Sequence, residues 1–162
     1  VRSRGLGDVY KRQVERQFNM MLDNMILAQK LSISPSEAVF YSHVSRYLER
    51  IADHSCRLAD IGYEAGRAST SHVVEFAEKA LEILDTAMSS FLNKKSDKST
   101  ITIDNGKSTL SKARKYFEDK YKKDVENPRE FSIAMDVIIR TLAYSTDICE
   151  TAINLSYKEV KG

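Results

Sequence analysis

The sequence predicts an all-α protein built from two tandem helical units. Apolar residues recur at helical spacing along most of the 162-residue chain. Only two prolines and six glycines interrupt it, and each proline follows a polar residue at the start of a long helical stretch. With 30% charged residues, this composition disfavours β-sandwiches and excludes collagen-like and disordered chains.

The first two helices are expected over residues 14–31 and about 34–66. The second has a clear start, because the Ser34 hydroxyl can accept a bond from a backbone N–H, Pro35 suits the first helical position and Glu37 completes a capping box. The apolar positions that give these helices their period are Val14, Phe18, Met21, Leu22, Met25 and Ile26, then Phe40, Val44, Leu48, Ile51, Leu58 and Ile61.

The rest of the chain repeats this order of helix, turn, polar cap, proline and long helix. The expected elements are a turn at 68–71, helices over about 72–93 and 107–123 separated by a polar loop at 93–105, and a helix over 128–157. The last helix begins at the cap Asn127-Pro128-Arg129-Glu130. The repeat is imperfect, because the two caps and the matching residues later in the two long helices are separated by different numbers of residues. It nevertheless favours two units packed by amphipathic faces.

The first thirteen residues, VRSRGLGDVYKRQ, show no helical period. The string GDVYKRQ resembles a translated sequencing adapter joined to an environmental DNA read. We therefore expect residues 1–13 to be non-native or disordered, with native sequence beginning near Val14 and its true N-terminus missing. The alternative is an ordinary flexible basic arm. An uninterrupted gene reading through the segment would refute the adapter interpretation.

The charge balance gives no support for a nucleic-acid footprint. Residues 1–13 hold four of the 25 basic residues and one of the 23 acidic residues, so 21 basic and 22 acidic residues remain. No apolar run predicts a membrane span or a secretory signal. Cys56 and Cys149 cannot form a disulfide framework, which favours reduced thiols and a cytoplasmic location. No phosphate-cradling glycine loop is present.

One group of acidic residues on the second helix suggests a metal-binding site. Glu49 and Asp53 stand one helical turn apart, with Cys56 and Asp60 on the same side. Two carboxylates at this spacing repel each other, and a divalent or ferric cation between them would remove that cost. A solvent-exposed acidic face, with its charge balanced by neighbouring arginines, would show the same spacing of carboxylates. His43, His54 and His72 are interpreted as surface or packing residues, and Met20, Met21 and Met25 as core filler.

The segment from Val14 to Asp60, above all RYLERIADHSCRLAD at 46–60, resembles the PhoU family of phosphate-uptake regulators. The hallmark of that family is E(D)xxxD on a long helix, here Glu49-x-x-x-Asp53. The lead-in to this motif is similar to archaeal members in particular. Their neighbouring helix usually carries Val-Asp-Arg, where this chain has Val14-Glu15-Arg16. The resemblance is weak over residues 72–157.

The resemblance implies a PhoU-like fold of two tandem three-helix bundles. The first repeat would cover residues 14–67 with two helices and lack its first helix, and the second would cover 68–162 with three. Similar archaeal proteins often begin with an AbrB-like DNA-binding domain, and such a domain could have been lost here as well. Family members hold iron or zinc clusters at the outer bundle surface.

That placement of the metal in the family makes Glu49, Asp53 and Glu15 the candidate metal ligands. The second copy of the motif has Ala143 where glutamate is expected and keeps Asp147, with cations around the position that matches Glu15. We therefore expect no metal in the second repeat.

The resemblance further implies a cytoplasmic adaptor and not an enzyme. It would restrain phosphate uptake by contacting the phosphate transporter and, in bacteria, a sensor kinase, without binding nucleic acid through this part; self-association is left open. A metal-free helical scaffold or oligomerisation module is the alternative. A ferritin-like di-iron enzyme is disfavoured, because no glutamate lies three residues before any histidine.

Overall fold

The computed structural model describes residues 4–65, 71–121, 125 and 127–159 of the chain, and every regular element among them is helical. This confirms the all-α fold class. The helices are α1 (Arg4–Asp23), α2 (Met25–Leu31), α3 (Pro35–Ala65), α4 (Ser71–Leu92), α5 (Ser99–Tyr121) and α6 (Pro128–Glu159). None of these helices is long and apolar enough to cross a membrane.

The chain divides into two compact units, Val1–Cys56 and Arg57–Gly162, which are described separately. The first unit holds two long helices, α1 and the beginning of α3, joined by the short α2, and the second holds α4, α5 and α6. The division falls inside α3. The boundary expected between residues 67 and 68, and most of the turn expected at 68–71, lie outside the described residues.

The helix expected over residues 14–31 is in fact two helices. Asn24 has extended backbone angles, and its side-chain oxygen accepts hydrogen bonds from the N–H groups of Ile26 (3.0 Å) and Leu27 (3.3 Å). An asparagine that satisfies free N–H groups in this way starts a new helix and ends the previous one. Ser32 then closes α2 in the left-handed region at φ 53°. Helical spacing alone did not reveal this interruption.

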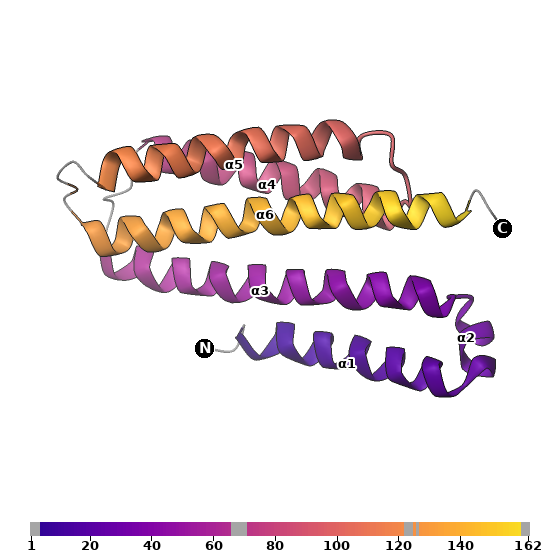
Figure 1. Cartoon of the computed structure of the whole chain (residues 1–162). Coiled ribbons are helices and arrows are strands. Elements are labelled where there is room, and N and C mark those ends of the chain that lie inside the picture. Colours follow the sequence, from indigo (N-terminus) through magenta and orange to yellow (C-terminus); the bar gives the residue numbers. More distant parts are fainter. Residues whose placement is uncertain (1–3, 66–70, 122–124, 126, 160–162) are drawn as a thin grey trace. The chain divides into compact units, whose positions relative to one another are not determined.

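Residues 4–13, expected to lack structure, form the first half of α1. Asp8 accepts ion pairs from Lys11 (3.2 Å) and Arg12 (2.8 Å), three and four residues further along the helix. Gly7 lies against α3, where a Cβ atom would be 3.8 Å from Ala52 and Glu49. In Figure 1, α1 runs beside α3. Helicity here does not test whether the segment is native, which stays a prediction.

The start of α3 confirms the predicted capping box. The Ser34 hydroxyl accepts the N–H of Glu37 at 3.1 Å, and the Glu37 carboxylate accepts the N–H of Ser34 at 2.8 Å.

A small apolar cluster joins the three helices of the first unit. It consists of buried Met21, Ala28 and Ala38 with half-buried Phe18, Leu27 and Ile33. Of the methionines interpreted as core filler, Met21 is 2% exposed and the interpretation is confirmed, whereas Met20 is 51% exposed and the interpretation is wrong. The side chain of Met25 lies outside the described residues.

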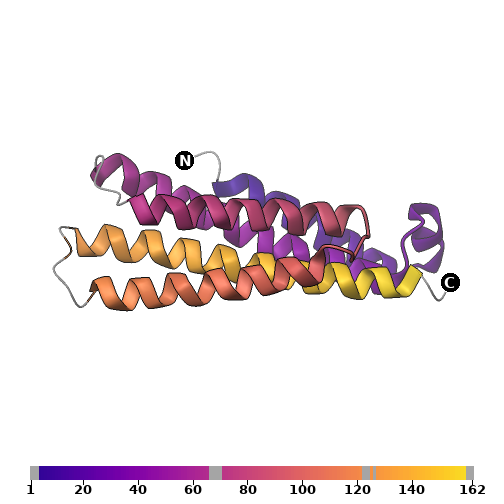
Figure 2. The same cartoon turned by 90° about the horizontal axis from the view of Figure 1, so that it is seen from above.

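The second unit is a three-helix bundle in which α6 packs against both α4 and α5 (Figures 1 and 2). The backbone carbonyl of Asn127 accepts the N–H of Phe131 at 3.0 Å, which starts α6 at the predicted proline cap. The core is apolar and consists of Val73, Ala80, Ile83, Ala113, Phe131, Met135, Ile138 and Leu142. Amphipathic faces of α4 and α6 thus supply most of this core.

The loop expected at 93–105 is too long, because α5 already begins at Ser99. The stretch from Ser99 to Asn105 is polar and rich in β-branched residues, which form helices weakly. Packing overrides this weakness, because Ser99, Thr102 and Ile103 are buried. The Ser99 hydroxyl has no hydrogen-bond partner among the described residues.

Candidate functional site

The middle of α3 places Glu49 and Asp53 one turn apart, as the sequence requires. Their surroundings differ. Asp53 is exposed, whereas the Glu49 side chain is 16% exposed because α1 lies along it. The ammonium group of Lys11 on α1 lies 3.3 Å from Glu49 Oε1 and also contacts Asp8. The outward-facing stripe expected for both carboxylates is therefore correct for Asp53 and not for Glu49.

Lys11 is the central cation of this arrangement. Its hydrogen bonds to Asp8 and to Glu49 raise the pKa of the Lys11 ammonium group, and the same contact with Lys11 lowers the pKa of Asp8. The ammonium group thus stays charged and occupies the position beside Glu49 that a metal cation would need. The sequence does not predict this contact, because Lys11 lies within residues 1–13, which are expected to be non-native or disordered.

Glu15, the third candidate ligand, lies one turn further along the helix pair. Its Oε1 atom accepts a hydrogen bond from Arg46 Nε at 3.0 Å. The contacts Glu15–Arg46 and Lys11–Glu49 show that α1 and α3 run antiparallel. Arg46 and Asp53 are seven residues apart on α3, about 10 Å along the axis, so Glu15 does not lie beside Asp53.

The carboxylates are therefore arranged as ion pairs and not as a ligand cluster. Among the described residues, no group of three or more acidic, histidine or cysteine side chains could hold a metal ion. A cation bound by Glu49 and Asp53 would have to displace Lys11 from Glu49, and recruiting Glu15 would require it to leave Arg46. Oxygen ligands suit hard and borderline cations, so the chemistry of the donors fits while their present geometry does not.

The remaining candidates are the histidines and Cys149, and their side chains do not gather into a metal site among the described residues. The ring of His72 stacks on Tyr116 with centroids 5.3 Å apart, while His43 is exposed and His54 half-buried. Cys149 is fully buried, and this burial raises the pKa of its thiol to about 11. The Cys149 thiol is therefore protonated at neutral pH, and its burial keeps it away from solvent.

In the second unit, the matching positions are Ala143 and Asp147 on α6. Asp147 is half-buried, and burial, with a smaller effect of Glu150, raises the pKa of its carboxyl group. The folded protein therefore binds the Asp147 proton more tightly than the unfolded chain does, so the ionised form opposes folding at neutral pH.

We expect Asp147→Asn to raise the free energy of unfolding at pH 7, because the amide carries no charge to desolvate. The gain over the wild type should shrink as the pH falls through the raised pKa toward the ordinary aspartate value of 3.8, where the wild-type carboxyl group is protonated as well. Urea denaturation at several pH values measures this. Asp104→Asn, at an exposed position of α5, is the control. An equal gain at every pH would contradict the assignment.

Comparison with known proteins gives one match. Residues 8–62 match the PhoU domain, which covers α1 from Asp8 onward, α2 and most of α3. The match contains Glu15, Glu49 and Asp53, and it starts inside the segment that was expected to be non-native. No curated protein and no solved structure is significantly similar to the chain.

Proposed function

We propose that this protein is a PhoU-like regulator of phosphate uptake and intracellular phosphate homeostasis. The observation that carries the proposal is the PhoU-domain match over residues 8–62. The all-α architecture supports it, since a bundle of long helices offers extended surfaces to other proteins. Among the described residues, no group of three or more histidine, cysteine, aspartate or glutamate side chains could hold a metal ion, and we propose an adaptor role in place of catalysis.

The adaptor would act by docking a helix surface onto components of the phosphate transporter in the cytoplasm, with a sensor kinase as a further partner in bacteria. Regulation of this kind needs a protein whose contact with the transporter depends on phosphate status. No part of the function requires the protein to bind nucleotides.

The test of this proposal is binding to the purified phosphate transporter at high and low phosphate concentration. We expect association whose strength differs between the two conditions. A transporter for an unrelated nutrient, tested in the same detergent or lipid, is the control for non-specific adhesion. Association with neither protein, or with both equally, would contradict the regulator function.

We further propose that Glu49 and Asp53 bind a metal ion, iron or zinc, with Glu15 as a third ligand. The support is the spacing of the two carboxylates on α3 within the PhoU-domain match. Bound metal would add positive charge to this face of the first unit. Lys11 and Arg46 compete with it for Glu49 and Glu15, so we expect the 162-residue chain to bind metal weakly.

We expect Glu49→Gln/Asp53→Asn to lose the metal that the wild type retains after loading and desalting, and Lys11→Ala to retain more. Elemental analysis measures the metal content. The matched control is Glu78→Gln/Glu82→Gln, which removes another exposed acidic pair one turn apart, on α4. Equal metal content in the wild type and the Glu49/Asp53 variant would contradict the metal site.

The second candidate function is a metal-free helical scaffold or oligomerisation module. One observation favours it: Glu49 and Glu15 already have ion-pair partners in Lys11 and Arg46. In that case, the carboxylates fix the register of α1 against α3 and bind nothing else. The elemental analysis above distinguishes the two functions, because a scaffold would show no difference between the variants.

A further inference from the structure

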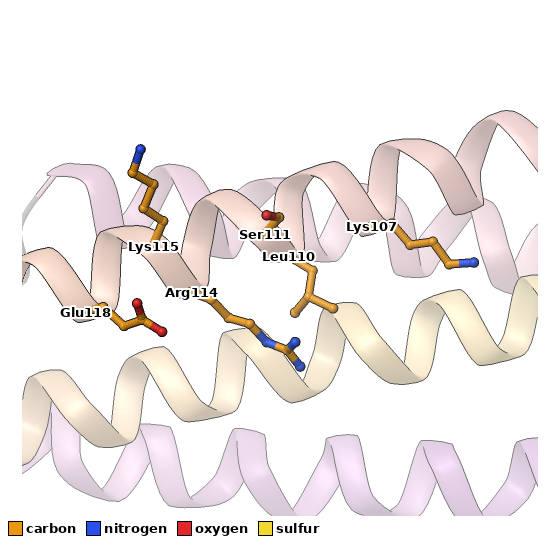
Figure 3. A pocket seen from close by; sticks show the side chains of 6 residues that line it. All are labelled: Lys107, Leu110, Ser111, Arg114, Lys115 and Glu118. Carbon is orange, nitrogen blue, oxygen red and sulfur yellow. The ribbon is translucent and has the colours of Figure 1, made fainter.

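A positively charged surface on α5 has no role in the function proposed above. From Lys107 to Phe117, α5 carries basic residues and no acidic ones. A surface cavity of about 330 Å³ opens along this helix, and Figure 3 shows its lining residues, which are Lys107, Leu110, Ser111, Arg114, Lys115 and Glu118. We call the part formed by Lys107, Ser111, Arg114 and Lys115 the basic surface. All four of these residues are exposed.

The geometry of the basic surface suits an extended partner. Lys107 and Lys115 are eight residues apart, so the surface covers about 12 Å of the helix. In Figure 3, the Arg114 side chain points toward α6, whereas Lys115 points away from it. Cations that diverge in this way do not converge on one small anion, but they can meet successive negative charges of a longer ligand.

Only part of this positive charge is neutralised within the second unit. Lys107 Nζ lies 3.5 Å from Glu150 on α6, and both side chains are more than half exposed. An ion pair of this length and exposure contributes little and can exchange for another carboxylate. Within the part of the chain that the structure describes, no carboxylate lies within ion-pair distance of Arg114 or Lys115. The basic surface therefore attracts acidic ligands.

The surroundings favour a protein ligand over a nucleic acid. Leu110 is half-buried against the bundle core and leaves part of its apolar side chain beside the cations, as in protein–protein interfaces. Acidic residues lie at both ends of the surface, with Asp104 before it and Glu118 and Asp119 after it. These carboxylates would repel a continuous phosphate backbone, whereas a short acidic segment fits between them.

We propose that the basic surface on α5 is a docking site for an acidic segment of a partner protein. The proposal rests on the adaptor function and adds to it the chemistry of the partner. Carboxylates of that segment bind Lys107, Arg114 and Lys115, the Ser111 hydroxyl donates a hydrogen bond, and Leu110 receives an apolar side chain.

The experiment measures binding of fluorescein-labelled poly-L-glutamate to the 162-residue chain by fluorescence anisotropy. The variant Lys107→Ala/Arg114→Ala/Lys115→Ala should bind at least about tenfold more weakly than the wild type, because three charge contacts are lost together. Ser111→Glu, which keeps all three cations and places a carboxylate among them, should also weaken binding. The matched control is Lys30→Ala/Lys95→Ala/Lys98→Ala, which removes three exposed lysines elsewhere and should change the affinity less than about twofold. Circular dichroism shows that each variant is folded.

Equal affinity for the wild type and both α5 variants would overturn the proposal, and so would an equal loss in the control variant. Labelled oligothymidylate of the same charge is the second probe. If it binds these residues more tightly than polyglutamate does, the surface is a nucleic-acid site and the proposal is wrong. The assay contains no transporter, so its failure leaves the transporter-binding result of the proposed function unaffected.

Discussion

Replacing Leu142 by alanine should lower the free energy of unfolding by about 2–5 kcal/mol. Leu142 lies in the middle of α6 and is 0% exposed in the core between α4, α5 and α6. The truncation removes apolar contacts and leaves a cavity that rigid helices on both sides cannot fill. Urea denaturation monitored by circular dichroism measures the change.

Leu81→Ala is the matched control for this variant. It makes the same truncation on a helix of the same bundle, but Leu81 is 62% exposed. We expect its effect to remain within about 0.5 kcal/mol. Similar losses for the two variants would mean that the second unit does not have the core described here.

Replacing Gly106 by alanine should also destabilise the second unit, by about 1–2 kcal/mol net of the gain in helix propensity. A Cβ atom at Gly106 would lie 2.8 Å from the hydroxyl oxygen of Thr146 on α6 and 3.7 Å from Ile83 on α4. Thr146 cannot turn away without cost, because it is buried and donates a hydrogen bond to the Leu142 carbonyl at 2.9 Å. Glycine therefore permits the close approach of α5 and α6.

A double-mutant cycle makes this explanation specific. Thr146→Ala removes the atom that an added methyl group would meet, so Gly106→Ala should cost less in that background than in the wild type. Asn105→Ala, at the neighbouring exposed position of α5, serves as a control and should be neutral or stabilising. Additive effects of Gly106→Ala and Thr146→Ala would show that steric contact is not the cause.

Much of the fold followed from the sequence because local signals agreed with packing. The capping box at Ser34 and Glu37 fixed the start of α3, and the second proline fixed the start of α6. Helical spacing identified buried residues such as Val44 and Ile51. Helical spacing did not predict the break at Asn24, because a side-chain cap inside a periodic stretch leaves the hydrophobic period nearly unchanged.

The candidate site was predictable in its residues and not in its contacts. The sequence by itself determined that Glu49 and Asp53 stand one turn apart, because that spacing is a property of any α-helix. Only the tertiary structure decided that Lys11 pairs with Glu49 and Arg46 with Glu15, because these contacts depend on the register of α1 against α3. That register comes from packing between distant segments, which the helical period does not encode, and it determines how readily a metal ion could reach these carboxylates.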